Sequence, residues 1–143
     1  MGLDAVVYKK LQSFPSKIQH LLQLVDSATG EMDFVDGTPD DLRTGVSLIA
    51  ADERIGNIAN VHWLTREIQQ RSRCGCNVLV SSVLYSGSHC GDVLTVAQTA
   101  SLERELDGID TAGEQTGNLV EFIASMRRLT AASREQGNPI VFV

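Results

Sequence analysis

Hydrophobic and polar residues alternate with a period of two in the first part of the chain. Ala5–Tyr8 is a short β-branched and aromatic run, which is typical of a strand. The stretches around Leu22 and Phe34 alternate on either side of Asp26–Gly30, a five-residue turn that ends in glycine. Alternation on both sides of a short turn predicts a β-hairpin.

The middle of the chain changes to apolar spacings of three and four residues. Thr38–Pro39 is a helix-start signal, with the hydroxyl as N-cap and proline in the first turn. The pattern from Leu48 to Arg71 predicts one long helix, which Gly56 weakens by about 1 kcal/mol. Trp63 is expected to anchor this helix in the core, because its large side chain is costly to expose.

The next apolar run, Val78–Tyr85, fits two kinds of element. The spacing of Val80 and Val83 is helical, whereas the valine content is typical of a strand; we favour the helix. A polar loop follows. Thr95 and Gln98 then have the spacing of a capping box, which predicts that another helix begins there.

The C-terminal part of the chain has the clearest helical pattern, over Asn118–Gln136. Gly137 is expected to end this helix in the left-handed conformation, and Pro139 prevents its resumption. Ile140–Val143 is then predicted to be a strand. The order of these elements predicts an α+β fold in one domain, residues 1–143. Four or five helices pack with a small sheet that includes the N- and C-terminal strands.

Charge and composition restrict the class of protein. Eighteen acidic residues against twelve basic ones give a net charge of −6, which argues against nucleic-acid binding and suits a basic protein partner. No apolar run approaches the roughly 18 residues of a membrane span, and the first residues lack the pattern of a signal peptide. Three cysteines make no disulfide framework. We therefore expect a cytoplasmic protein that is not in a membrane.

A ten-residue stretch between two apolar patterns, Val83–Asp92, collects the most chemically active side chains. The candidate binding residues in it are Ser86, Ser88, His89 and Asp92. One interpretation is structural: the aspartate and the serines hydrogen-bond loop amides. A second is a recognition loop. A catalytic serine, histidine and aspartate are disfavoured, because a triad usually draws its members from distant segments.

A zinc site is possible in principle but is not predicted. The candidate ligands are Cys74, Cys76, His89 and Cys90. Structural zinc sites usually have cysteines spaced by two to four residues, and adjacent ligands rarely converge on one tetrahedron. We interpret the cysteines as small, partly buried thiols. No metal and no cofactor are predicted.

Six carboxylates lie within sixteen residues and form a candidate acidic patch. They are Asp26, Glu31, Asp33, Asp36, Asp40 and Asp41. The calcium-loop register, with glycine at the sixth position and glutamate at the twelfth, is absent. Such a run is usually a solvated face. Its functional interpretation is a negatively charged surface for a basic protein.

Four stretches resemble a group of small bacterial proteins of similar length, of the kind encoded beside polymorphic toxins. They are Met1–Asp4, Arg54–Ala59, Val83–Asp92 and Asn138–Phe142. In that group serine is more usual at the position of Cys90, which weakens a zinc or thiol role. The resemblance implies an immunity protein that neutralises a toxin domain by direct binding, without enzymatic activity. The alternative is a small enzyme or ligand-binding protein that uses the Ser86–Asp92 loop. The sequence does not predict an oligomeric state.

Overall fold

Two strands from opposite ends of the chain form the middle of the main sheet. The computed structural model describes residues 2–73, 75, 77–113 and 117–143. The sheet has four antiparallel strands in the order β4-β1-β6-β5. These are β4 (Ile49–Gly56), β1 (Leu3–Tyr8), β6 (Ile140–Phe142) and β5 (Val93–Leu94). Ala5 lies opposite Phe142, which confirms the predicted pairing of the terminal strands.

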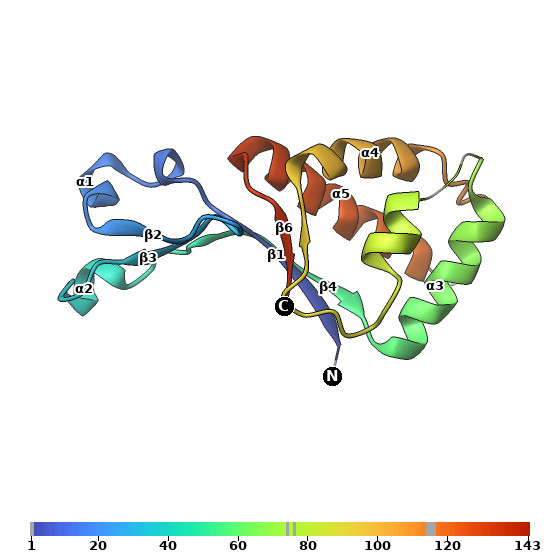
Figure 1. Ribbon diagram of the computed structural model, residues 1–143, viewed down its shortest axis with the longest axis horizontal. Coiled ribbons are helices and arrows are strands. Elements are labelled where there is room, and N and C mark those ends of the chain that lie inside the picture. Colours follow the sequence, from blue (N-terminus) through green and yellow to red (C-terminus); the bar gives the residue numbers. More distant parts are fainter. Residues whose placement is uncertain (1, 74, 76, 114–116) are drawn as a thin grey trace.

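Helices cover one face of this sheet and form the main core with it (Figure 1). They are α3 (Ile58–Arg71), the π-helical turn η2 (Leu79–Val83), α4 (Val96–Asp107) and α5 (Asn118–Gln136). Inward residues of β1 and β6, such as Ala5 and Phe142, contact fully buried helix residues such as Leu64, Leu102 and Met126. Trp63 is partly buried and packs against this core. The predicted α+β fold class is confirmed.

The predicted long helix from Leu48 to Arg71 is wrong in its first half. Residues 49–56 are strand β4, because β1 offers them a full antiparallel ladder, with Ala5 opposite Glu53. The chain turns into α3 at Gly56, where φ is +147° and an added Cβ would lie 2.7 Å from Asn60. Asn57 then caps α3, its side chain accepting the Asn60 amide at 2.9 Å.

Two other local signals are confirmed, and a third, the N-cap predicted at Thr38, is wrong. The C-terminal helix α5 has the predicted bounds and ends at Gly137, whose φ of 67° is left-handed. The capping box at the start of α4 has both of its bonds, from the Gln98 amide to Thr95 Oγ1 and from the Thr95 amide to Gln98 Oε1. The Thr38 hydroxyl is not an N-cap. It donates instead to the Val35 carbonyl at 2.6 Å.

The run Val78–Tyr85 is helical up to Val83, as favoured from its spacing, and the start of this helix is stabilised from a distance. Glu105 of α4 is only 8% exposed. One of its carboxylate oxygens accepts the Val78 amide and the other accepts the Leu79 amide, each at 2.8 Å. A buried carboxylate thus satisfies two amides that the first turn of a helix leaves free.

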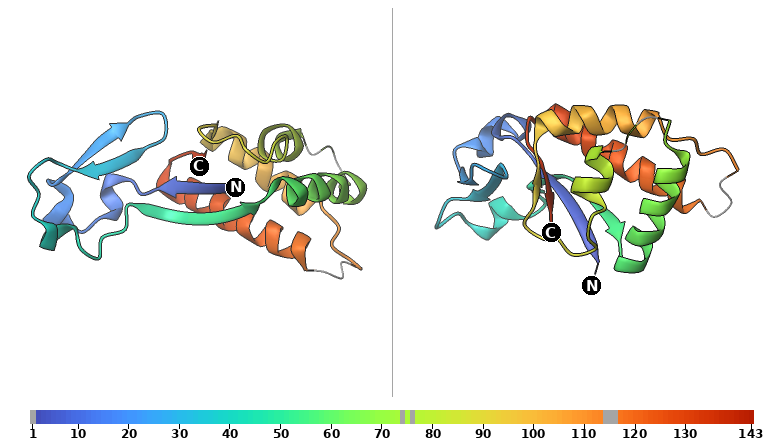
Figure 2. Two further views of the ribbon diagram at one scale, coloured as in Figure 1. Left: turned by 90° about the horizontal axis from the view of Figure 1, so that it is seen from below. Right: turned by 45° about the vertical axis from the view of Figure 1, so that its right-hand side comes forward.

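Residues 9–48, which we call the arm, extend away from the main sheet between β1 and β4 (Figures 1 and 2). The arm contains the predicted hairpin. Its elements are the 3₁₀ turn η1 (Leu11–Ser13), α1 (Ser16–Gln19), β2 (Leu22–Asp26), β3 (Glu31–Phe34) and α2 (Asp40–Arg43). A small hydrophobic cluster of its own holds it together, formed by Phe14, Ile18, Leu22, Met32 and Phe34.

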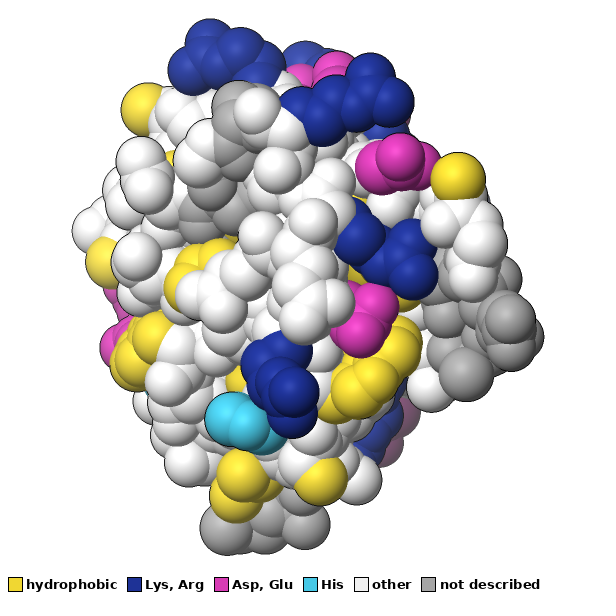
Figure 3. Space-filling model, turned by 90° about the vertical axis from the view of Figure 1, so that its right-hand side faces the viewer, with side chains coloured by type: hydrophobic (Ala, Val, Ile, Leu, Met, Phe, Trp, Pro, Cys, Tyr) yellow, Lys and Arg dark blue, Asp and Glu magenta, His cyan; other side chains and the backbone are white. Residues whose placement is uncertain are grey.

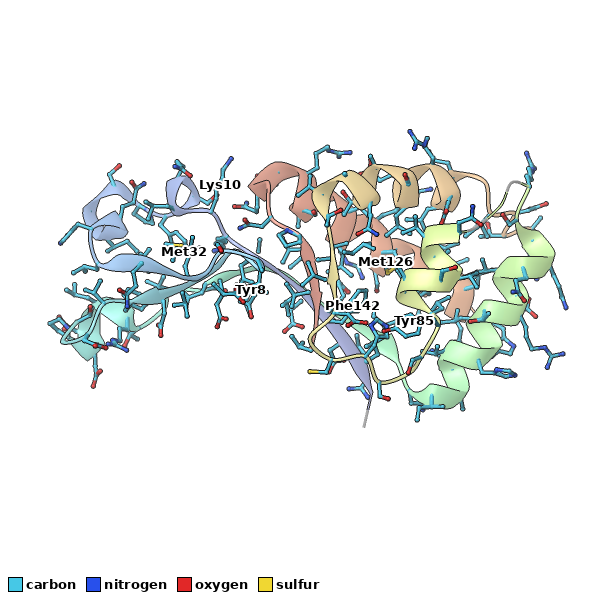
Figure 4. The ribbon with its side chains drawn as sticks, viewed as in Figure 1. Tyr8, Lys10, Met32, Tyr85, Met126 and Phe142 are labelled. Atoms are coloured by element: carbon cyan, nitrogen blue, oxygen red, sulfur yellow. The ribbon has the colours of Figure 1, made fainter. Side chains whose placement is uncertain are left out.

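The base of the arm is hydrogen-bonded to the end of α5 and the residues after it (Figure 4). The Lys10 amide donates to Gln136 Oε1 at 3.0 Å, and Asn138 Nδ2 donates to the Tyr8 carbonyl at 2.8 Å. Gly30, at the hairpin turn, is so close to Asn138 that an added Cβ would lie 2.4 Å from Asn138 Oδ1. These contacts fix the arm on the main body.

Candidate functional site

The Ser86–Asp92 loop is built around a buried histidine. His89 lies between the rings of Tyr85 and Phe142, with centroids at 4.5 and 4.3 Å. Its Nε2 donates to the Val83 carbonyl at 2.8 Å, since a carbonyl only accepts. Its Nδ1 lies 3.5 Å from Asp92 Oδ2 and has no hydrogen-bond partner among the described residues.

Asp92 does not bond loop amides as the structural interpretation predicted. Its carboxylate accepts the Tyr85 hydroxyl, and that bond raises the pKa of Tyr85, with smaller effects of burial and of the Asp92 charge. The backbone of Asp92 instead ties the loop to β6, because its carbonyl accepts the Phe142 amide at 3.0 Å. Asp92 was among the candidate residues predicted from the sequence, but its hydrogen-bond partner Tyr85, seven residues earlier, was not.

The two serines stabilise the turn itself. The Ser88 amide donates to Ser86 Oγ at 3.2 Å, as the structural interpretation predicted for a serine. Within the described part of the chain, neither serine hydroxyl hydrogen-bonds to His89. Gly87 lies against α3, where an added Cβ would be 2.7 Å from the Ile58 backbone. The loop is therefore held by packing and by backbone bonds, without the serine–histidine contact that nucleophilic catalysis needs.

A groove of about 600 Å³ runs beside the loop, between α3 and η2. Ile58 and His62 line it from α3, and Tyr85 and Ser86 line it from the loop. Figure 3 looks onto the α3 side of the molecule, where hydrophobic side chains lie among basic and acidic ones. This groove was not predicted, because its walls come from two segments, and a helical pattern in each does not show that they lie side by side.

Of the three cysteines, the structure describes only Cys90. Cys74 and Cys76 lie outside the described residues. Cys90 is exposed, although a partly buried thiol was expected. The neighbouring His89 ring is directed at Val83 and Asp92. Across the described ranges, no three histidine, cysteine or carboxylate side chains come together as metal ligands.

The acidic residues of the arm fall into two groups. Asp26 and Glu31 are cross-strand partners at the turn end of the hairpin, and both are half-buried. They lie near Tyr8, whose pKa is raised by burial first and then by the charges of Glu31 and Asp26. The carboxylate of Asp26 also accepts the Ala28 amide at 2.8 Å. This group belongs to the junction between arm and body.

The other four carboxylates are exposed on the outer part of the arm. They are Asp33, Asp36, Asp40 and Asp41. Asp33 accepts the Phe34 amide at 2.7 Å, and Asp40 and Asp41 form the first turn of α2. The structure therefore brings the six predicted residues onto one arm but not into one cluster.

The acidic residues of the arm lie in one segment of it, whereas its four basic residues, Lys9, Lys10, Lys17 and Arg43, lie outside that segment. Residues 22–41 contain these six carboxylates and no lysine or arginine; the remaining twelve acidic residues balance the twelve basic ones. Several carboxylates of the body are paired, as in Glu53–Arg128 and Glu103–Arg134, although Asp52 and Glu135 have no ion pair among the described residues. None of the six arm carboxylates has an ion-pair partner within the described part of the chain.

Sequence reasoning missed the exposed hydrophobic residues on β2. Leu24 lies opposite buried Met32 in the regular part of the ladder, and the register shifts, as at a β-bulge, only after it, between Leu24 and Asp26. Leu24 and Val25 are 56% and 58% exposed. A five-residue turn that ends in glycine is a signal for such a bulge, since longer hairpin loops often carry one.

Comparison with known proteins gives no match: no family model, curated protein or solved structure is significantly similar to the chain. Among the described residues, no helix combines the length and the apolar character needed to cross a membrane.

Proposed function

We propose that this protein is non-enzymatic and acts by binding another protein, a basic toxin domain that it neutralises as an immunity protein. The observation that carries the proposal is the arm with its six carboxylates that lack ion-pair partners among the described residues. A charged surface left unpaired within the molecule costs little in water and attracts a partner of opposite charge. The resemblance of four sequence stretches supplies the specific class of partner.

The test uses the toxin domain encoded by the neighbouring gene and a charge-reversed arm. Asp36 and Asp41 are exposed, and their carboxylates accept no hydrogen bond within the described part of the chain. Asp36→Lys with Asp41→Lys moves the net charge from −6 to −2 without disturbing the hairpin. Glu31 is a poorer choice, because it is half-buried beside Asp26. We expect association with the toxin domain to slow about tenfold or more at low salt, measured by surface plasmon resonance.

A matched control changes the same charge elsewhere. Asp52→Lys with Glu135→Lys also gives −2, on exposed residues of the body. Association of this control is expected to slow much less than that of the arm variant. Equal on-rates of the two variants would refute the role of the arm. Immunity itself fails if the toxin domain does not bind and co-expression gives no protection.

A second candidate is a ligand-binding protein or small enzyme that uses the groove beside the Ser86–Asp92 loop. The groove, with the polar side chains of His62 and Ser86 at its edge, favours it. A neighbouring metabolic operon, in place of a toxin gene, would support this candidate. Saturable binding of a metabolite, lost on filling the groove by Ser81→Trp, would establish it.

A further inference from the structure

Strand β2 has an uncovered edge. It pairs only with β3 in a two-stranded sheet. In the described structure, no group outside β3 hydrogen-bonds to the backbone of Gln23, Leu24 or Val25. All three are exposed, so the strand is open to solvent on both faces and along one side. Outward amides and carbonyls of such an edge are a ready template for another strand.

One edge of the main sheet, strand β4, is protected in a way that β2 is not. Edge strand β4 carries Asp52, Glu53 and Arg54 in succession. Charged residues at an edge prevent pairing with other chains, because an added strand would desolvate them. β2 has no charged residue before Asp26 and no proline, and it presents Leu24 and Val25 instead. This contrast indicates that β2 is an edge that a partner covers.

We infer that β2 binds an extended, basic strand of the partner protein, which adds to the hairpin next to β2. This inference deepens the proposed function and rests on it. Asp33 lies opposite Gln23 on β3. A residue of the added strand that faces Gln23 would lie two strand spacings, about 10 Å, from Asp33. If that residue is a lysine, its side chain and that of Asp33 are together long enough to reach each other. Backbone bonds supply affinity in such complexes and the side chains supply specificity.

A second copy of this chain is a less favourable occupant of the same edge. Pairing β2 with β2 would bring two arms together, each with six carboxylates and no basic residue between positions 22 and 41. Like charges across paired strands are destabilising. Charge complementarity therefore selects a basic strand.

The test uses a synthetic peptide of eight alternating lysine and valine residues with blocked ends. The control peptides are an alternating glutamate and valine peptide, and the lysine and valine peptide with every amide N-methylated. N-methylation removes the backbone donors and keeps the charges. We expect the lysine peptide to slow amide hydrogen exchange at residues 23–25, and the methylated peptide to bind at least tenfold more weakly in calorimetry.

The outcomes separate this inference from the proposed function. Equal binding of the methylated and unmethylated peptides, or unchanged exchange at residues 23–25, would overturn strand addition while the charge-dependent binding of a toxin domain still stood. Binding of the glutamate peptide as tightly as the lysine peptide would overturn the basic character of the strand. A β2-dependent dimer in sedimentation would identify a second copy as the occupant and also overturn it. Slower toxin association of the Asp36→Lys, Asp41→Lys variant would support the proposed function, and it does not test strand addition to β2.

Discussion

Glu105 stabilises the start of η2 through the two backbone amides that its carboxylate accepts. We expect Glu105→Gln to destabilise the protein, because the amide group keeps one acceptor oxygen and sets its own NH₂ against the second backbone donor. A hydrogen bond to a charged group contributes about 1.5–3 kcal/mol. Both bonds here are 2.8 Å long and the side chain is 8% exposed, so solvent cannot replace them.

The expected loss is therefore one charged bond plus an amide left without a partner. We estimate about 2–4 kcal/mol in the free energy of unfolding for Glu105→Gln. Glu105→Ala removes both bonds and leaves a void, and should cost at least as much. Equilibrium urea unfolding, followed by tryptophan fluorescence and by circular dichroism, measures both variants. Trp63 serves as the probe, since it packs against the core that η2 completes.

Glu103→Gln is the control on the same helix. Glu103 pairs with Arg134 at 2.6 Å, but the arginine side chain is 68% exposed, so this pair contributes at most about 1 kcal/mol. The two substitutions make the same chemical change two positions apart on one helix, in different surroundings. A Glu105→Gln variant no less stable than Glu103→Gln would refute the reasoning that a buried carboxylate holds the start of η2.

Two further predictions concern the rest of the body. Hydrogen bonds from Arg128 lower the pKa of Glu53, so the pair should stabilise the fold above the ordinary carboxyl value of 4.5 and lose its effect as the pH falls through the lowered pKa. The free energies of unfolding of wild type and Glu53→Gln, measured in urea, should then differ by about 1 kcal/mol or less at neutral pH and converge near pH 2. A difference that stays constant from neutral pH to pH 2 would refute this prediction. Gly87→Ala should lower the melting temperature by several degrees, because the added Cβ would lie 2.7 Å from the Ile58 backbone. The control is Gly91→Ala at an exposed position, where the φ of +95° strains the backbone but the added Cβ meets no neighbouring atom. A Gly87→Ala protein as stable as wild type would refute the clash and show that α3 can move away.

The elements that were predicted correctly carry their own signals. The end of α5 at Gly137 needs only a left-handed residue followed by Pro139, and the start of α4 needs only Thr95 and Gln98. The hairpin likewise follows from alternation on both sides of a glycine-ended turn. Each of these depends on residues a few positions apart, so the sequence pattern is sufficient.

The errors arise where a distant segment decides the outcome. Strand β4 exists because β1, more than forty residues earlier, offers it a ladder, and its apolar spacing alone also fits a helix. The cap of η2 comes from Glu105, 27 positions after Val78. In the candidate site, sequence found the carboxylates of the arm and the histidine loop. It did not find the exposed edge of β2, because alternation alone does not show that the small hydrophobic cluster of the arm includes Leu22 and leaves Leu24 exposed.

The position of β6 between β1 and β5 has a consequence for biosynthesis. β1 is made first, and the strand that lies beside it is made last, since Tyr8 and Ile140 are 132 positions apart. At the usual rate of translation, roughly 7 to 26 seconds pass between them. During that interval β1 can pair with β4 but keeps one side unsatisfied. A nascent or truncated chain without residues 140–142 therefore exposes an apolar strand edge, which makes it a substrate for chaperones and for aggregation.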